Sequence, residues 1–242
     1  MTRVAVVAGV GPGLGASIVR RFAAEGCSVA LLARSESYLN ELAAEVAEGP
    51  GEALAVPTDL ADPDEIRSAF EEVRGAFGPV DVLVNHASSG SWKGLRELSV
   101  EELDHATAVG VRGAFVCAQE AVDDMLERGE TEGDEKTGTV LFTGATSAVR
   151  GRDGALGFSA AKFGARGMAE SMAKELGSEG VHVAHVVLDG GIRPPNREVE
   201  DEAAYLDPDD IAETYWRLVE QDASTMTFET HITNGPGDIE FL

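Results

Sequence analysis

The chain has 242 residues, of which 43% are hydrophobic, and it carries 19 lysines and arginines against 43 aspartates and glutamates. This length is enough for a well-buried core, and no apolar run reaches the roughly 20 residues that a membrane-spanning helix needs. The formal net charge of −24 argues against binding to nucleic acid or to an anionic membrane surface.

The acidic residues are spread over every segment, with no single acidic tail. We expect a surface adapted to a salty cytoplasm, where high ionic strength screens the self-repulsion of the charge, and an acidic mesophilic protein is the alternative. The first predicted strand starts by Arg3 or Val4, which leaves no room for a signal peptide and predicts a cytoplasmic protein. Cys27 and Cys117 are predicted to be free, buried thiols.

Short apolar runs typical of buried strands alternate along the chain with segments of helical apolar spacing. The predicted strands cover residues 4–8, 28–33, 53–56, 80–84, 139–142, 181–188 and 227–233. The predicted helices cover residues 16–22, 38–46, a segment that starts at 62, 99–128, 158–176 and a segment that starts at 207, with an acidic loop over 129–138. This alternation predicts an α/β protein with a three-layer, doubly wound (Rossmann) fold and a parallel sheet of about seven strands, in a single domain over 1–242.

Four glycines, Gly9, Gly11, Gly13 and Gly15, separate the first strand from the first helix. A tight turn at this point directs bare backbone N–H groups and the positive end of a helix at one place. The pyrophosphate of a dinucleotide suits such a place, whereas a strand-to-helix turn without a ligand is the alternative.

Residues elsewhere in the chain link this glycine turn to a known protein family. Asp59 follows the third predicted strand, Asn85 and Ala87 follow the fourth, and Lys162 lies on the helix over 158–176. With the Gly9-x-x-x-Gly13-x-Gly15 spacing, the chain resembles the short-chain dehydrogenase/reductase superfamily over essentially its whole length. The resemblance implies a nicotinamide dinucleotide cofactor, with Asp59 contacting the adenine. It implies cofactor contacts at Gly9, Gly11, Gly13, Leu14, Gly15, Arg34, Ser35, Asp59, Leu60, Asn85, Ala87, Lys162, Gly190 and Ile192.

Arg34 lies 19 residues after Gly15, where such folds distinguish NAD from NADP. An acid there would bind the ribose 2′-hydroxyl, but this strand ends in Ala33 and is followed by an arginine that can pair with a 2′-phosphate. We therefore expect NADP(H) rather than NAD(H); an Arg34 that only stacks on the adenine would permit NAD.

The chemistry that the resemblance implies departs from the family pattern. Family members usually carry Asn, Ser, Tyr and Lys, and the tyrosine donates a proton to the substrate carbonyl. Here the Tyr-x-x-x-Lys positions hold Phe158 and Lys162, the serine position falls on Ala145, and the asparagine position falls on Gly110. A phenylalanine cannot act as a general acid, and the loss of one typically costs about 10²–10⁴ in rate.

Several residues are candidates to compensate. Thr146 and Ser147 lie one and two places after the missing serine, and Asp189 occupies the place of the proline in the usual Pro-Gly pair. His86 could titrate near neutral pH. Each also has a purely structural alternative, as a turn residue, a loop cap or a pocket wall. The catalytic candidates are therefore Lys162, Thr146, Ser147 and Asp189.

Two functions remain open at this point. The first is an NAD(P)-dependent oxidoreductase for a carbonyl or alcohol substrate, and the second is a non-catalytic NADP(H)-binding sensor or oligomer partner. No metal site is expected, because His182 and His185 lie three apart on a strand and so face opposite ways. The resemblance also implies a homodimer or homotetramer through a helix rich in small residues, namely Gly157, Ala160, Ala161, Gly164 and Ala165.

Overall fold

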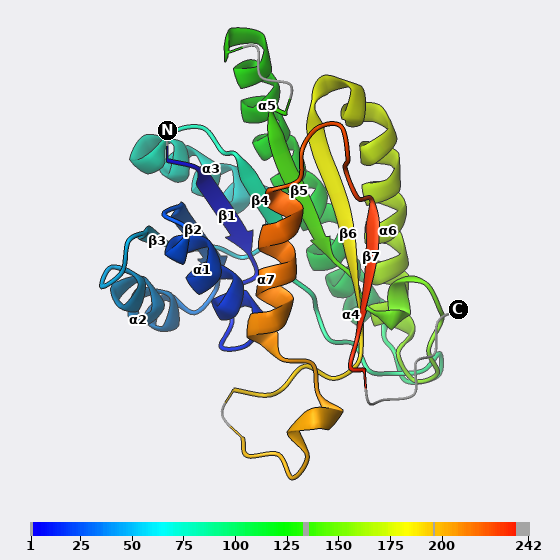
Figure 1. Ribbon diagram of the computed structural model, residues 1–242. Helices are drawn as coiled ribbons and strands as arrows, with labels where there is room; N and C mark the ends of the chain where they lie inside the picture. The colour runs from blue at the N-terminus through cyan, green and yellow to red at the C-terminus, as the bar shows by residue number, and fades with distance from the viewer. Residues whose placement is uncertain (1, 133–135, 196, 236–242) are drawn as a thin grey trace.

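The computed structural model describes residues 2–132, 136–195 and 197–235. Its centre is a sheet of seven parallel strands in the order β3-β2-β1-β4-β5-β6-β7, which confirms the predicted fold class (Figure 1). The strands are β1 (Val4–Ala8), β2 (Ser28–Ala33), β3 (Glu52–Pro57), β4 (Val82–Asn85), β5 (Gly138–Thr143), β6 (Val181–Asp189) and β7 (Glu229–Thr233).

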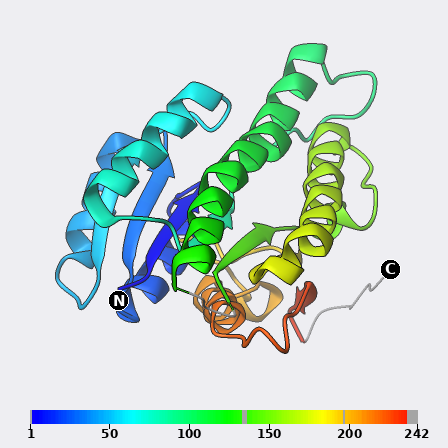
Figure 2. The ribbon, with the colours of Figure 1, turned by 90° about the horizontal axis from the view of Figure 1, so that it is seen from above.

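Helices cover both faces of this sheet (Figure 2). They are α1 (Leu14–Ala24), α2 (Glu36–Val46), α3 (Pro63–Phe77), α4 (Val100–Thr107), α5 (Ala114–Glu132), α6 (Leu156–Leu176) and α7 (Pro208–Val219). An apolar core lies on each face of the sheet, and successive residues of β1 point into one core and then the other. Ala5 and Val7 pack with α1, α2 and α7, whereas Val4 and Val6 pack with α3, α5 and α6. Because the inner strands are buried on both faces, their sequences are mostly apolar and do not alternate between apolar and polar residues.

Strands β2 and β3 are added on one side of β1, and strands β4 to β7 are added on its other side. The strand order therefore reverses between β1 and β4. In open parallel sheets, the crevice beyond the carboxyl ends of the strands at such a reversal is where ligands bind. The topology therefore places the glycine turn after β1, and the loops after β4 and β5, at one shared edge.

The predicted helix over 99–128 is interrupted, which corrects the sequence prediction. A helix starts at Ser99 as predicted, and Ser99 caps α4 in a capping box with Glu102, but residues Ala108–Gly113 form a π-helical turn before α5 begins. A Cβ on Gly113 would lie 2.1 Å from the carbonyl oxygen of Leu60, so the segment closely approaches the loop after β3. This contact is long-range and left no periodic signal in the sequence.

The predicted acidic loop over 129–138 is also shorter than expected. Helix α5 continues to Glu132 and β5 begins at Gly138, while residues 133–135 lie outside the described part. Within the described residues, every helix is too short or too polar to cross a bilayer.

Candidate functional site

The glycine turn leaves a bare backbone cradle at the start of α1. Gly9 has a φ of +110°, and a Cβ there would lie 2.5 Å from the backbone nitrogen of Ala87. Gly15 is similarly restricted, because its Cβ would meet the carbonyl oxygen of Gly9 at 2.9 Å. Gly11 and Gly13, in contrast, have nothing within 4 Å of an added Cβ. Packing alone explains the first and last glycines, and the open space over the middle two fits an anionic group bound against the backbone.

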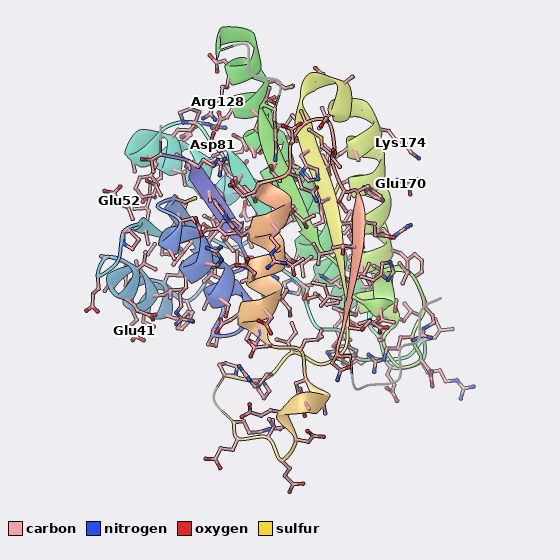
Figure 3. All side chains as sticks on the ribbon, viewed as in Figure 1. Glu41, Glu52, Asp81, Arg128, Glu170 and Lys174 are labelled. Carbon is pink, nitrogen blue, oxygen red and sulfur yellow. The ribbon has the colours of Figure 1, made fainter. Side chains whose placement is uncertain are left out.

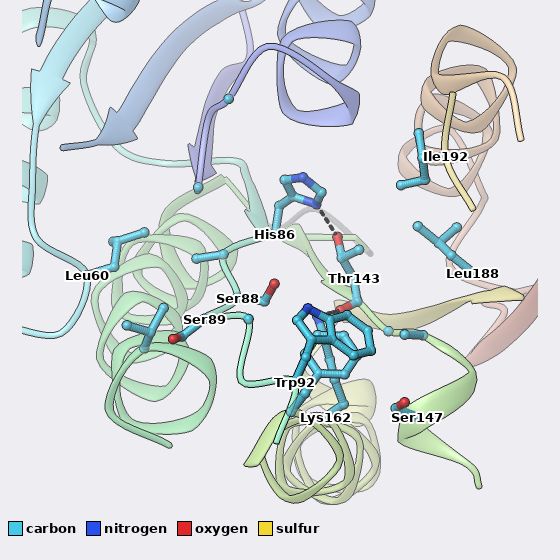
Figure 4. Close-up of a pocket in the computed structure, with 18 of the residues that line it drawn as sticks. Leu60, His86, Ser88, Ser89, Trp92, Thr143, Ser147, Lys162, Leu188 and Ile192 are labelled. Atoms are coloured by element: carbon cyan, nitrogen blue, oxygen red, sulfur yellow. Dashed lines mark hydrogen bonds between the residues drawn. The ribbon is translucent and has the colours of Figure 1, made fainter. Parts of the chain in front are cut away.

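A cavity of about 1070 Å³ extends from this turn to α6 along the carboxyl edge of the sheet (Figure 4). Its walls come from the ends of β1 to β6, so the topology brings together residues that are far apart in sequence. The predicted site residues that line it are Gly9, Gly11, Arg34, Asp59, Leu60, Ala87, Thr146, Ser147, Lys162, Asp189, Gly190 and Ile192.

Five predicted contacts lie outside the wall of this cavity: Gly13, Leu14, Gly15, Ser35 and Asn85. Leu14 is only 2% exposed and belongs to the core, and Ser35 precedes α2 without forming a side-chain cap. The side-chain amide of Asn85 donates to the Ala114 carbonyl at 3.3 Å, which joins β4 to α5. The next two residues after Asn85 form the cavity wall instead.

Arg34 and Asp59 mark the cavity end at β2 and β3. The Arg34 side chain is exposed, as a residue that receives a charged group requires. The Asp59 carboxylate accepts a hydrogen bond from the backbone N–H of Ala61 at 2.9 Å, so one of its oxygens already stabilises the turn after β3.

Lys162 lies at the opposite end, and its ammonium is buried. Its Nζ donates to the Thr143 carbonyl at 2.7 Å, and it lies 5.7 Å from the ring centroid of Phe158. Burial lowers the pKa of Lys162 to about 8. A cavity ammonium with a pKa this close to neutrality can both hold and release a proton under ordinary conditions.

The Phe158 ring is covered in turn by Trp92, from the loop after β4. The two rings are stacked, with centroids 4.9 Å apart and an interplanar angle of 28°. Trp92 is 59% exposed, so the pair forms an aromatic wall that reaches from Lys162 towards the cavity mouth.

His86 faces the glycine turn and takes part in a hydrogen-bond chain that sequence reasoning missed. Its Nδ1 lies 3.1 Å from the Thr143 hydroxyl (Figure 4). The Thr143 hydroxyl in turn lies 2.7 Å from the buried hydroxyl of Tyr215. We assign Tyr215 as donor to Thr143, and Thr143 as donor to His86, because the reverse direction leaves the buried tyrosine hydrogen unpaired. The hydrogen of the His86 ring is then on Nε2.

The prediction that His86 titrates near neutral pH is wrong, whereas its alternative role as a residue of the pocket wall is confirmed. Burial, and second the charge of Lys162, lower the pKa of His86 to about 4, so the ring is neutral near pH 7. Tyr215 lies 72 residues from Thr143 in the sequence, and no local pattern marks it as part of this site.

The remaining catalytic candidates are brought together in part. The Thr146 hydroxyl donates to Asp189 at 2.5 Å, so these two candidates form one pair. Ser147 is 2% exposed within the short helix that follows Ala145. Gly110 lies in the π-helical turn, where a Cβ would come within 3.0 Å of the Ala161 Cβ.

Other reactive side chains do not form a second site. Cys27 and Cys117 are free and buried, as predicted, and burial raises their pKa values to about 11 and about 12. Within the described residues, no three His, Cys, Asp or Glu side chains gather in a way that could hold a metal ion.

Comparison with known proteins identifies the family and the fold. A family model described as short chain dehydrogenase matches residues 3–203. The 3-oxoacyl-(acyl-carrier-protein) reductase of Staphylococcus aureus is 28% identical over 247 residues, which cover 97% of this chain and 98% of that protein.

Two solved structures show the same fold. An alcohol dehydrogenase from the archaeon Thermococcus sibiricus, complexed with 5-hydroxy-NADP, matches all of both chains with a TM-score of 0.88 at 24% identity. A 3-ketoacyl-(acyl-carrier-protein) reductase from Brucella melitensis, complexed with NADH, matches 96% of this chain and 97% of its own with a TM-score of 0.85 at 26% identity.

Proposed function

The chain belongs to the short-chain dehydrogenase family of NAD(P)-dependent oxidoreductases, and on that premise we propose that it interconverts a carbonyl and an alcohol using NADP(H). One observation carries the proposal: a single cavity joins the open glycine turn to the buried ammonium of Lys162. A dinucleotide would extend along this cavity, with its pyrophosphate at the glycine turn and its nicotinamide at the Lys162 end.

When bound, the cofactor supplies or accepts the hydride. In this proposal the backbone around Gly11 and Gly13 binds the pyrophosphate, and Lys162 holds the ribose next to the nicotinamide. Arg34 pairs with a 2′-phosphate, because β2 ends without an acidic side chain to bind the 2′-hydroxyl of NAD. Similar proteins have been solved with an NADP-type cofactor and with NADH, so the fold alone does not decide between the two cofactors. In this chain we assign the preference for NADP to Arg34.

The proton needs a different donor from the family tyrosine if Phe158 occupies that position. We propose Lys162, because its ammonium is in the cavity and burial lowers its pKa to about 8. The hydrogen-bonded Thr146–Asp189 pair is the second route. In this route Asp189 first takes a proton from solvent, and its carboxylic acid then gives that proton to the threonine hydroxyl as the hydroxyl passes its own proton to the substrate oxygen. Ser147 can assist by binding the substrate oxygen.

Cofactor binding and turnover test this proposal separately. We expect NADPH to bind in a calorimetric titration in 1 M KCl, and reduction of at least one ketone or aldehyde in a panel to exceed that of K162A by about 10²-fold or more. Binding without turnover of any substrate would instead support the non-catalytic sensor. The double variant A145S/F158Y then restores the usual family residues: activity that appears only in this variant would mean that the natural site is degenerate.

The cofactor preference has its own variant. R34Q should weaken NADPH binding about tenfold or more and leave NADH binding almost unchanged, since only the phosphate loses a charged partner. The matched control is R67Q, which removes an exposed arginine that pairs with Asp64 on α3 instead. Equal losses for both cofactors would contradict the assignment of Arg34 to the 2′-phosphate.

We also propose a homo-oligomer and a cytoplasmic location. The predicted contact face of α6 is smaller than expected, because three of its small residues are buried inside the protomer: Gly157, Ala161 and Ala165. Ala160 and Gly164 are exposed beside Phe163, which is 44% exposed, so this side of α6 is the face available to a second copy. Light scattering coupled to gel filtration should give a dimer or tetramer, and a lower mass for F163E.

A further inference from the structure

The charge of the cavity is opposite to that of the molecule. Over the whole chain, acidic residues outnumber lysine and arginine by 43 to 19. The basic side chains in the cavity wall are Arg34, Arg150, Arg152 and Lys162, and the acidic ones are Asp59 and Asp189. Of these two carboxylates, Asp59 lies at the Arg34 end, and Asp189 accepts a hydrogen bond from Thr146.

Two of the arginines, Arg150 and Arg152, lie at the end of the cavity away from the glycine turn. The guanidinium carbon of Arg152 lies 5.7 Å from the ring centroid of Trp92, and it forms no ion pair with any described residue. Trp92 stacks on Phe158, whose ring centroid lies 5.7 Å from the Lys162 Nζ. A continuous wall of contacts therefore leads from the Lys162 ammonium across two aromatic rings to the Arg152 guanidinium.

This sequence of groups matches a substrate of a particular shape. The edges of the stacked aromatic pair provide an apolar side wall for the body of a substrate. The guanidinium over the outer face of Trp92 suits a carboxylate, which it binds in a two-pronged geometry. A molecule with a charge of −24 repels small anions at long range, so an anionic substrate needs local positive charge at the mouth. Arg152, over the ring of Trp92, supplies positive charge of this kind at the aromatic end of the cavity.

We propose that the substrate of this cavity is a carbonyl compound that also carries a carboxylate, held by Arg152. This inference rests on the proposed oxidoreductase function. In the reduction, the carbonyl carbon receives a hydride from NADPH and the oxygen receives one proton, which gives a hydroxy acid and NADP⁺. The carboxylate is unchanged and acts as the group by which the substrate is oriented, with its carbonyl towards Lys162.

Matched pairs of ketones test the proposal. We compare 7-oxooctanoate and 6-oxo-6-phenylhexanoate with their methyl esters, which keep the carbon skeleton and lose the charge. In these acids the carbonyl and the carboxylate are separated widely enough to extend along the two stacked rings. In 1 M KCl, where long-range steering is screened, we expect kcat/KM for the acids to exceed that for the esters about tenfold or more. The acid-to-ester ratio should fall towards one in R152Q and in R150Q/R152Q, mainly through KM, while R67Q keeps the natural ratio.

Equilibrium binding separates the two proposals. Calorimetric titration of the NADP⁺-saturated protein with each acid and each ester needs no turnover. Preferential binding of the acid that R152Q or R150Q/R152Q abolishes supports the carboxylate subsite, even if no ketone is reduced and the oxidoreductase proposal fails. Acid and ester that bind and react equally well, or a preference that persists in R150Q/R152Q, would overturn the subsite and leave the oxidoreductase proposal intact.

Discussion

At the scale of single residues, the tautomer of the neutral His86 ring depends on a pair of hydroxyl groups behind it. Thr143 donates to Nδ1 of His86 and accepts from the buried Tyr215, so it fixes which ring nitrogen carries the hydrogen. T143V removes the donor to Nδ1 and leaves the Tyr215 hydroxyl without an acceptor. We expect a loss of about 1–3 kcal/mol in the free energy of unfolding and a mixture of His86 tautomers.

Nitrogen-15 NMR of the imidazole rings measures this directly, with H86N to assign the signals of His86. The Nε2–H tautomer should dominate at pH 7 in the wild type and in T143S, which keeps the hydroxyl. Because the pKa of His86 is about 4, its ring should also remain uncharged down to pH 5. A protonated His86 ring at pH 6, or an Nδ1–H tautomer in the wild type, would contradict the assigned chain.

Lys162 gives a prediction for the dependence of rate on pH. If its ammonium is the proton donor in carbonyl reduction, the active form is the protonated one, and its fraction falls as the pH rises through about 8. We therefore expect kcat for reduction to be level below pH 7 and to fall tenfold for each unit well above pH 8. The same limb should persist in D189N, which leaves Lys162 unchanged.

Proton transfer through the Thr146–Asp189 pair predicts different effects of D189N and of a second variant, K162M. If the Thr146–Asp189 pair carries the proton, D189N removes most of the reduction rate, whereas K162M raises KM for the cofactor and keeps a measurable kcat. That outcome would assign the proton to the carboxylate pair and reject Lys162 as donor.

At the scale of elements, local patterns sufficed where an element's own residues decide its structure. The apolar runs predicted all seven strands, and Asp62, Ser99 and Asp207 cap the helices that they were expected to start. Patterns failed where distant contacts decide. The π-helical turn at Ala108–Gly113 and the bond from Asn85 to α5 depend on neighbours that the sequence does not place beside them.

The same limit applied to the candidate site. The glycine turn and Lys162 could be found from spacing, but the pairing of Thr146 with Asp189 required the register of β5 and β6. No pattern in the sequence predicted the contacts of Gly144 either. His185 lies under it, with its Nε2 2.4 Å from the place of an added Cβ, and its Nδ1 bonds to Glu229 on β7 at 2.9 Å.

The π-helical turn provides a test at this scale. In G113A the new Cβ would lie 2.1 Å from the Leu60 carbonyl oxygen, so the turn and the loop after β3 must separate. We expect a loss of about 1–3 kcal/mol in the free energy of unfolding, measured by urea denaturation. The matched control is G75A on α3, where an added Cβ meets nothing within 4 Å and helix propensity predicts a gain of up to about 1 kcal/mol. A G113A protein as stable as the wild type would show that this close approach does not restrict the residue.

At the scale of the whole molecule, the net charge of −24 sits mainly on outward-pointing side chains (Figure 3). Glu41 and Glu52 are exposed examples, whereas Asp81 is buried and pairs with Arg128. Exposed like charges lower the stability of the compact state, and salt screens them more than it screens buried pairs. The distribution therefore predicts a protein that gains stability as ionic strength rises.

We expect the Tm to rise between 0.1 and 2 M KCl, because the screening length falls below about 3 Å above 1 M salt. Each 1 kcal/mol of relieved repulsion raises the Tm of a chain of this size by roughly 2–4 °C. The variant E41K/E52K separates screening from a general effect of salt on apolar burial, since each substitution removes two units of negative charge and leaves the core unchanged. Its Tm should be higher than that of the wild type at 0.1 M KCl and should rise less steeply with salt. A wild-type Tm that does not rise, or equal slopes in the two proteins, would mean that surface repulsion does not limit the stability of this fold.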